Sequence, residues 1–318
     1  MDWLWQAVVG NGAYGLLVAA LLGLMWRWQR NRRDDFFLPI VLTDSESMRD
    51  NVRGNAAGYF SSLGMFRRTI TGLPHVDLTR VAGSQAELVS SEMWRELLVE
   101  TLRTLRKAND VAGRRSRERL HVVFGTLSLW NFALGTMLKN RHALRLYHFQ
   151  NGDYHFIWEM DRRVKNLQSP KAGQPFEHRF FRVTPGTASA KRECLVVHVG
   201  THPIGQDVER YRAAHLPDAS LRVLTKVRDL DPKNPTQWIR AAAELTHAIC
   251  DQTVSQATEL YLFTDAPAVL MLMAGDAIGD YSRRVCLMQL VKSSSEQDAK
   301  TYREVLRLPD PELSKLAG

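Results

Sequence analysis

Four short polar loops, each at the end of an apolar segment that predicts a β-strand, contain the residues that could bind a ligand. Threonine and serine hydroxyls and exposed backbone N–H groups can bind phosphate oxygens and base edges. Asp44 and Asp265 could accept hydrogen bonds from ribose hydroxyls or exocyclic amines. The alternative for every candidate is a structural role in a helix cap or a turn. The candidates are Thr43, Asp44 and Ser45; Gly125, Thr126 and Ser128; Thr201 and His202; and Thr264 and Asp265.

Motifs for catalysis or metal binding are not evident. The sequence has no GxSxG, HExxH or CxxC motif, and its three scattered cysteines favour a reducing compartment without disulfides. Residues 10–15, GNGAYG, match GxGxxG, but no strand precedes them. His202 beside Thr201 could assist attack by a ribose hydroxyl on a phosphodiester, yet this isolated pair does not predict an enzyme. We therefore predict a binding protein with no catalytic residue, cofactor or metal.

The elements that position these loops occur twice along the chain. Each copy has a strand with its polar loop, an LT(R/K)V segment, a helix with a tryptophan near its start, a strand, an apolar helix and a final strand. A shift of 140 residues with no gap sets the segment 120–138 over 260–278 and superposes Gly135 on Gly275. Four features in the same order indicate an internal duplication. The other matching pairs are LTRV (78–81) with LTKV (224–227), and Trp94 with Trp238.

Alternating strands and helices predict an α/β fold with a parallel sheet in each half and helices on its faces. The tryptophan-bearing helices are expected over 84–109, opened by a capping box of Ser84 and Glu87, and over 235–253. Ligands of open α/β sheets bind at the carboxyl ends of the strands. The duplicated loops therefore predict one site shared by the two halves.

Two strand-like segments, 154–160 and 176–183, lie between the halves and are expected to form a connecting hairpin. We accordingly divide the chain into four parts. They are an N-terminal segment (1–33), a first half (34–153), a connector (154–190) and a second half (191–318).

Residues 1–33 predict a membrane anchor. No charged residue occurs from Trp3 to Trp26, and about 20 apolar residues suffice to cross a bilayer. Arginines follow the span, so the positive-inside rule places the rest of the chain in the cytoplasm and the N-terminus outside. A cleaved signal peptide fits poorly, because the basic residues follow the apolar stretch. Small or polar residues that recur every four positions could pack against a second copy of the helix: Asn11, Gly15, Ala19 and Gly23.

A net charge of +8 favours partners that carry phosphate. Arg80 and Lys226, within LTRV and LTKV, are candidates to neutralise ligand phosphates. The arginine-rich run at 114–119 is interpreted as a solvated loop, with a phosphate-facing role as the alternative. The uncharged segment 54–66 is too short to span a membrane and is interpreted as a packed helix.

Two segments resemble the signatures of SAVED domains. The segment from Leu120 to Met160 resembles the first signature, with an apolar helix that ends in Leu-Gly and two strands that contain Tyr147 and Trp158. The segment ELYLFTDAPAVLMLMAGDAI resembles the second, a strand ending in Phe, a loop with Pro and an apolar helix with Gly. Its matching residues are Phe263, Pro267 and Gly275.

The resemblance covers about residues 36–316 and implies two pseudo-symmetric Rossmann-like (CARF-like) halves fused in one SAVED domain, here preceded by a transmembrane helix. It implies a receptor for a cyclic oligonucleotide, most often a cyclic trinucleotide, in bacterial antiphage signalling of the CBASS type. In such proteins, ligand binding stacks the receptor domains into homo-oligomers and switches on a fused effector. The fused element in this chain is the membrane helix.

We therefore expect a single-pass protein of the bacterial inner membrane that oligomerises and disrupts that membrane in abortive infection. Its expected partners are the cyclic oligonucleotide, membrane lipid and further copies of itself, and no DNA or RNA duplex. The alternatives are a membrane-bound, ring nuclease-like phosphodiesterase that degrades the same messenger, a scaffold that binds no nucleotide, and an effector of a type III CRISPR system.

Overall fold

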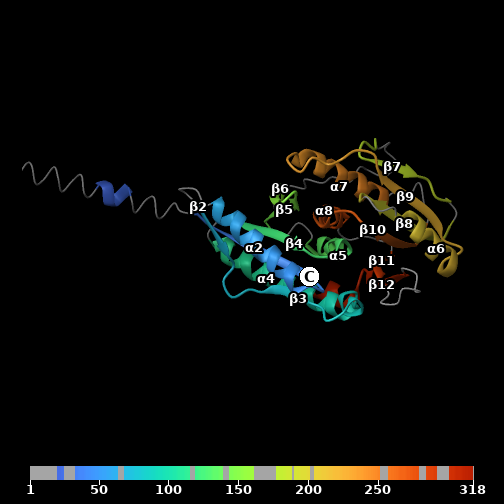
Figure 1. Cartoon of the computed structure of the whole chain (residues 1–318), viewed down its shortest axis with the longest axis horizontal. Helices are drawn as coiled ribbons and strands as arrows, with labels where there is room; N and C mark the ends of the chain where they lie inside the picture. Colours follow the sequence, from blue (N-terminus) through green and yellow to red (C-terminus); the bar gives the residue numbers. More distant parts are fainter. Residues whose placement is uncertain are drawn as a thin grey trace, which may run out of the picture.

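A computed structural model describes residues 20–24, 33–63, 68–114, 119–138, 143–160, 177–187, 190–200, 204–250, 257–278, 284–291 and 301–317. The folded part contains two sheets, one from each half of the chain, with helices between and around them (Figure 1). Both sheets are rich in parallel strand pairs. The predicted α/β class is confirmed, and the arrangement is consistent with two fused Rossmann-like halves.

The first half contributes β1 (Arg33–Thr43), α2 (Glu46–Ser62), β2 (Arg68–Gly72), β3 (Leu78–Val81), α3 (Gln85–Leu88), α4 (Ser91–Arg114), β4 (Leu120–Gly125), α5 (Ser128–Leu138), β5 (Leu144–Gln150) and β6 (Asp153–Met160). The sheet order is β2-β1-β4-β5-β6, and β3 pairs with β1 beyond β2. β1 is long enough to pair with β2 through its first residues and with β3 through its last.

The second half contributes β7 (Phe181–Thr184), β8 (Arg192–His198), α6 (Gly205–His215), β9 (Ser220–Lys226), α7 (Pro235–Cys250), β10 (Glu259–Thr264), α8 (Ala268–Ile278), β11 (Arg284–Val291), β12 (Thr301–Leu308) and α9 (Pro311–Ala317). The sheet order is β12-β11-β10-β8-β9-β7. The central strands β8, β9, β10 and β11 run parallel, and the two edge strands are antiparallel to their neighbours.

Strand register places the LTRV and LTKV segments at matching points of the two sheets. Leu78 of β3 pairs with Ile40 of β1, and Leu224 of β9 pairs with Val197 of β8. In both halves this pairing lies near the carboxyl end of the strand that leads into the first polar loop. The repeated order of elements that the sequence predicts is therefore present in the structure.

Both halves also contain a β-bulge at the same place. In β5 the register shifts between Leu146 and Tyr147, and in β11 it shifts between Leu287 and Met288, which is 141 residues further along the chain. A bulge is a specific local feature of a strand. Its repetition at matching positions supports duplication more strongly than the few sequence identities do.

The two halves meet where α5 packs against α8 (Figure 1). A Cβ atom on Gly135 would lie 2.3 Å from the carbonyl oxygen of Leu272, and one on Gly275 would lie 2.2 Å from the carbonyl oxygen of Phe132. No side chain fits at these distances, so glycine at both positions lets the helix backbones touch. The glycine pair that coincides in the sequence repeat thus marks the contact between the halves.

Each half lays its tryptophan-bearing helix against the other half. α4 contacts β12 and α9, and α7 contacts β6. Trp94 and Trp238 are buried, and their indole N–H groups donate to the carbonyl oxygens of Leu88, at 2.9 Å, and Asp231, at 3.0 Å. The repeated tryptophans therefore anchor the start of each helix to the segment that leads into it.

The helix predicted over 84–109 is divided into α3 and α4. Ser84 caps α3 by accepting from the N–H of Glu87 at 3.2 Å, and Ser90 accepts from the N–H of Met93 at 3.1 Å in the first turn of α4. Two serine caps, six residues apart, therefore divide the segment into two helices where one helix with a single cap was expected. The helix predicted over 235–253 is α7, which ends at Cys250 in the described residues.

The predicted connecting hairpin is wrong. β6 pairs with β5 in the first sheet, and β7 pairs with β9 in the second. Each segment is strand-forming, as expected, but it completes the edge of the sheet in its own half. An edge strand offers unpaired N–H and C=O groups to any nearby strand, and each segment uses the nearest edge.

In the part of the chain that the structure describes, no helix is both long and apolar enough to cross a membrane. Asn11, Gly15 and Ala19 of the predicted helix-packing stripe lie outside the described residues. Gly23 lies in the described segment 20–24, with open space around a Cβ at that position. The segment 54–66 belongs to α2 as far as Ser62 and packs through buried Ala56 and Phe60, as predicted for a packed helix.

Candidate functional site

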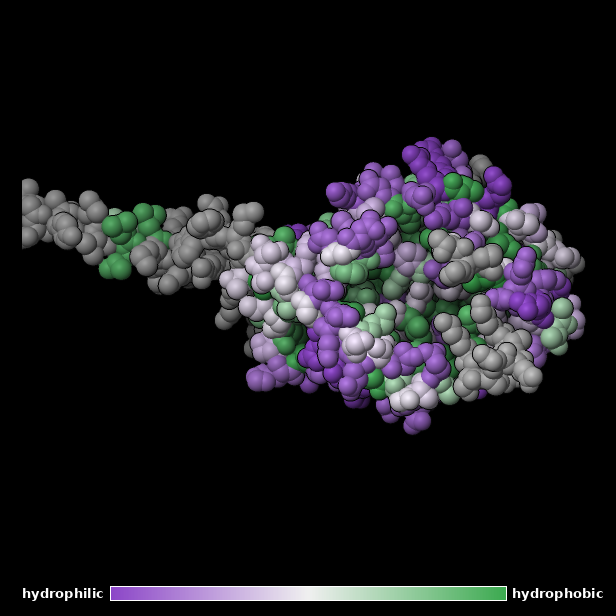
Figure 2. Space-filling view, viewed as in Figure 1, coloured by the Kyte–Doolittle hydropathy of each residue, from purple (hydrophilic) through white to green (hydrophobic). Residues whose placement is uncertain are grey.

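The β4–α5 and β10–α8 loops, which correspond to each other in the two halves, are in direct contact. The Ser128 hydroxyl donates to the carbonyl oxygen of Ala266. The helices that follow these loops pack against each other at Gly135 and Gly275, so the carboxyl ends of β4 and β10 lie close together. Apolar side chains occupy the centre of the face in Figure 2, where Figure 1 shows α5 and α8, and hydrophilic side chains surround them.

Asp265 binds the end of β8. Its Oδ2 lies 2.7 Å from Nδ1 of His198, and its Oδ1 accepts from the N–H of Val199 at 2.6 Å. A Cβ on Gly200 would lie 2.8 Å from Oδ2, so a glycine there lets the loop close over the carboxylate. The His198 and Asp265 side chains are 19% and 21% exposed. A ligand on this edge could therefore contact both side chains.

His198 is a further candidate residue that the sequence analysis did not include. The segment CLVVHVGT was interpreted as a strand as far as its last residues, with the loop at Thr201 and His202. β8 ends at His198, and Thr201 and His202 lie outside the described residues. A single polar residue near the end of an apolar strand was the available signal.

Three candidate hydroxyls hold their own loops in shape. Thr43 Oγ1 accepts from the N–H of Ser45 at 3.2 Å, and Thr264 Oγ1 accepts from the N–H of Ala266 at 2.9 Å. Ser45 is the N-cap of α2, and its Oγ accepts from the N–H of Met48 at 3.3 Å. These bonds are the cap and turn roles that were the alternative for each residue.

The remaining candidates in the first half lie at the carboxyl ends of β1 and β4. Exposed Asp44 accepts from the side-chain amide of Gln85, and the Thr126 hydroxyl accepts from the amide of Asn131. A Cβ on Gly125 would lie 2.9 Å from the side chain of Val52, because α2 crosses closely there. Asp44 is thus accessible to a ligand, whereas Gly125 has a packing role.

An open cavity of about 780 Å³ lies beside His198, between α6 and the sheet. Apolar side chains of β9 and polar side chains of α6 line it, including Leu221, Val223, Gln206 and Arg210. The cavity adjoins the carboxyl ends of β8 and β9, which is where an open α/β sheet binds its ligands.

Tyr302 of β12 packs nearby, with its ring against Phe263 and Tyr211. Its buried hydroxyl has no hydrogen-bond partner among the described residues. Burial raises the pKa of Tyr302, and the charges of Asp207 and Asp265 raise it further. The phenol is therefore neutral at physiological pH and retains a free O–H donor.

The two LT(R/K)V cations are engaged within their own halves. Arg80 pairs with Glu100 of α4, and Lys226 Nζ lies 2.7 Å from Asp229. Each is partly exposed. Their charges are thus partly neutralised before any ligand phosphate arrives.

Nothing in the described residues forms a metal site, since no three His, Cys, Asp or Glu side chains are grouped to hold an ion. Cys194 and Cys286 are buried. Burial raises the pKa of each thiol to about 12, so both stay protonated and are poor nucleophiles.

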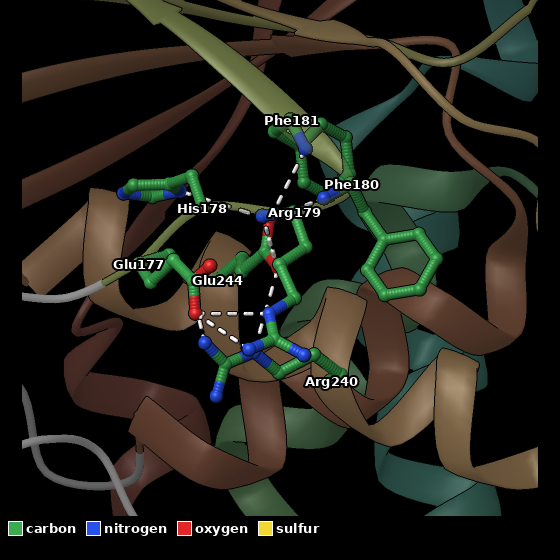
Figure 3. Close-up of polar contacts among 7 residues, drawn as sticks. All are labelled: Glu177, His178, Arg179, Phe180, Phe181, Arg240 and Glu244. Carbon is green, nitrogen blue, oxygen red and sulfur yellow. Dashed lines mark hydrogen bonds and ion pairs between the residues drawn. The ribbon is translucent and has the colours of Figure 1, made fainter.

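A second polar cluster fixes the start of the second sheet (Figure 3). Glu244 of α7 is fully buried and accepts from the backbone N–H groups of Arg179, Phe180 and Phe181 at 2.9, 2.9 and 3.1 Å. Burial acts to raise the pKa of Glu244, but hydrogen bonds from His178 and the three N–H groups outweigh it and lower that pKa. This cluster holds the start of β7 on α7, and Phe181 pairs with Lys226 at the carboxyl end of β9.

No protein-family model matches this sequence, and no curated protein matches it. Among solved structures, the Cap4 SAVED/CARF-domain containing receptor of Acinetobacter baumannii has a similar fold. Its structure with the cyclic trinucleotide 2′3′3′-cAAA aligns with a TM-score of 0.53 and 15% identity, over 89% of this chain and 53% of that chain. Its structure with 3′3′3′-cAAA aligns with a TM-score of 0.51 and 16% identity, over 85% and 51%.

The chain spans about half the length of these receptor structures. At such low identity the likeness establishes the fold. The protein has the SAVED/CARF-domain fold, as its two signature-like segments predict.

Proposed function

We propose that this protein is a membrane-anchored receptor of the SAVED family that binds a cyclic oligonucleotide, with a cyclic trinucleotide as the first candidate. The observation that carries the proposal is the contact between the β4–α5 and β10–α8 loops through Ser128 and Ala266. It brings the carboxyl ends of two duplicated sheets to one place, which suits a ligand with an internal repeat. The ligand bound by the Cap4 receptor belongs to this class.

The polar groups at this edge match such a ligand. The Thr126 hydroxyl, which accepts from Asn131 and keeps its own O–H, and backbone N–H groups can donate to phosphate oxygens. Asp44 can accept from ribose or base donors. Asp265 holds Nδ1 of His198, which leaves Nε2 for a ligand. The site has no need of a metal or cofactor in this scheme, because the ligand needs only to be bound.

Ligand binding then favours stacked homo-oligomers in the cytoplasm, and the tethered helices cluster through Asn11, Gly15, Ala19 and Gly23. Clustering of single-pass helices damages the inner membrane and aborts a phage infection, in a CBASS-type pathway. A ligand shifts this assembly only by its difference in affinity for the two states.

Purified full-length protein should be incubated with a panel of cyclic di-, tri- and tetranucleotides, followed by light scattering and chromatography of the nucleotide. Intact ligand with larger particles is the expected result. Absence of binding across the panel would overturn the proposal in favour of a scaffold.

Two aspartates test the position of the site. Asp265→Asn weakens the bonds to His198 and Val199 and is expected to weaken binding about tenfold or more, since hydrogen bonds to charged groups contribute about 1.5–3 kcal/mol. Asp44→Asn, at the matching edge of the first half, serves as the companion variant and should weaken binding less. Equal affinity of Asp265→Asn and wild type would contradict the assigned site.

The membrane step has its own test. Gly15→Leu with Gly23→Leu should abolish toxicity in cells but leave the affinity for the cyclic oligonucleotide unchanged, because bulky residues prevent close helix approach. Unchanged toxicity would remove helix clustering from the scheme.

A second candidate function is a phosphodiesterase that opens the same ring, and the His198–Asp265 pair is the observation that favours it. His198 Nε2 would take the proton from a ribose hydroxyl as its oxygen bonds to the adjacent phosphorus. The bond from phosphorus to the ribose oxygen of the next nucleotide breaks, and that oxygen takes a proton from water. Linear product in the panel experiment, lost in His198→Ala, would support this function over the receptor.

A further inference from the structure

A second cavity, of about 580 Å³, lies at the amino edge of the first sheet. Phe36 of β1 and Leu120 of β4, which pair with each other, form one wall, and α4 forms another. The segment between β2 and β3 closes it with Leu73 and Val76. Apolar atoms dominate this lining, so the interior favours an apolar group.

Three of the side chains that line the cavity are basic. Exposed Arg103 and Lys107 project from α4 and have no ion-pair partner among the described residues. Arg119, a third lining residue, lies 3.4 Å from Glu159.

The two acidic side chains at this cavity already have partners. Glu100 pairs with Arg80, and Asp77 lies 3.6 Å from Arg53 and also accepts from the Thr79 hydroxyl. Two unpaired cations therefore remain beside an apolar pocket. This combination matches a molecule that joins an anionic head to an apolar chain.

The position of the cavity along the chain indicates where such a molecule would come from. The predicted span ends at Trp26, and Phe36, in the cavity wall, lies ten positions further along the chain. Ten residues reach at most about 35 Å when fully extended. Strands β1 and β4 are parallel, so the cavity lies at the opposite edge of the sheet from the polar loops at Thr43 and Gly125.

We propose that this cavity binds an anionic phospholipid of the inner leaflet. Its phosphate contacts Arg103 and Lys107, and the adjoining part of an acyl chain lies against Phe36, Leu73 and Val76. This inference rests on the proposed membrane anchor. The bound lipid orients the domain with its amino edge on the membrane and its ligand-binding edge toward the cytoplasm, where copies can stack.

The test uses the full-length chain purified in a neutral detergent. Dioleoyl phosphatidylglycerol is added, with dioleoyl phosphatidylcholine as the uncharged comparison, and retained lipid is counted by native mass spectrometry. Wild type should retain one phosphatidylglycerol in preference to phosphatidylcholine. Arg103→Glu with Lys107→Glu should weaken this binding by more than about 25-fold, because the loss of each basic residue near an anionic lipid costs roughly fivefold and each glutamate adds repulsion.

Two further variants separate the cavity from general surface charge. Arg284→Glu with Arg303→Glu makes the same charge change on exposed residues of the second half and should retain wild-type lipid binding. Thr104→Trp fills the cavity from α4 without changing charge and should also abolish retention. Binding that survives Thr104→Trp, or is lost equally in the second-half variant, would overturn the proposal.

Failure of the lipid site and failure of the proposed receptor give different results. The cavity variants should keep wild-type affinity for the cyclic oligonucleotide, since the two sites lie at opposite edges. A carbonate wash of membranes tests the anchor separately. Release of the wild-type protein by this wash would refute the transmembrane anchor, whatever number of bound lipids is measured. Where the glutamate variant does not fold, Arg103→Gln with Lys107→Gln provides the same comparison with a smaller expected loss.

Discussion

The two halves share a topology, but the loops that follow the corresponding strands β1 and β8 are stabilised by different contacts. In the first half, Ser45 caps α2 and bonds the N–H of Met48. In the second half, α6 begins after Ile204 with no side-chain cap, and the end of β8 is held by Asp265. Duplication thus preserved the sheet and changed the chemistry at its edge. At this edge the second half has a carboxylate paired with an imidazole, whereas the first half has a helix cap beside the exposed Asp44.

A glutamate at matching positions of α4 and α7 also has different roles. Glu100 and Glu244 are 144 residues apart, as are Trp94 and Trp238. Glu100 is 41% exposed and pairs with Arg80. Glu244 is fully buried and binds three backbone N–H groups. The same helix position therefore supports a surface ion pair in one half. In the other half it holds the backbone at the start of β7, and we call this set of three hydrogen bonds the Glu244 clamp.

The largest expected effect is at the buried ion pair of the second sheet. Arg222 Nε lies 2.6 Å from Glu193, and each side chain is 1% exposed. Arg222→Met leaves a buried carboxylate without its cation and should reduce the free energy of unfolding by about 4 kcal/mol in urea denaturation. Lys315→Met, which breaks an exposed pair with Glu312, is the control and should cost less than about 1 kcal/mol. Similar losses of unfolding free energy in both variants would contradict the expected difference between a buried and an exposed ion pair.

The second-largest expected effect is at the contact between the two halves. Gly275→Ala places a methyl group within 2.2 Å of the Phe132 carbonyl oxygen, and it should cost about 3 kcal/mol, at the upper end for overpacking. Gly58→Ala in α2 has open space around its Cβ and should stabilise by about 0.5–1 kcal/mol. Thermal and urea unfolding would measure both. A neutral Gly275→Ala would refute a tight contact between α5 and α8.

The matched glutamates provide a pH experiment. Glu244→Gln should cost about 2 kcal/mol, since it loses charge-assisted bonds, and Glu100→Gln should cost less than about 1 kcal/mol. The pKa of Glu244 is lowered from its ordinary value of 4.5. Its contribution to stability is therefore fully present above pH 4.5 and is lost as the pH falls through the folded-state pKa. Wild type should lose more stability in that range than Glu244→Gln does, and parallel pH profiles would refute the clamp.

The smallest effect is at the helix cap of the first half. Ser45→Ala removes the acceptor for the Met48 N–H and should cost about 1 kcal/mol. Ser47→Ala, two residues on and exposed, should change stability by less than about 0.5 kcal/mol. Affinity for the proposed cyclic oligonucleotide ligand tests whether Ser45 has a second role. If folded Ser45→Ala binds this ligand more weakly than wild type, then the first half also contributes a hydroxyl to the ligand.

Much of the fold could be predicted from local pattern. The apolar segments ended in polar loops close to the expected residues, and Gly135 and Gly275 marked the contact of the halves. The connecting segments were strand-forming, but their partners were not predictable, because pairing depends on which sheet edge is nearest. Ser90 divided the helix expected at 84–109, since a second cap competes with helix continuation. His198 was missed because its place within an apolar strand gave no sign of Asp265, 67 residues away.

The sequence by itself determined the duplication, the order of strands and helices and the basic character of the chain, because periodicity, capping residues and charge are properties of neighbouring residues. Only the tertiary structure decided which polar groups meet. Three features join residues that are distant in sequence. They are the hydrogen bond from Ser128 to Ala266, the hydrogen bond from the Val199 N–H to Asp265, and the cavity that Phe36 lines together with the cations of α4. Such contacts depend on how the packed helices bring the strand ends together, which local pattern does not encode.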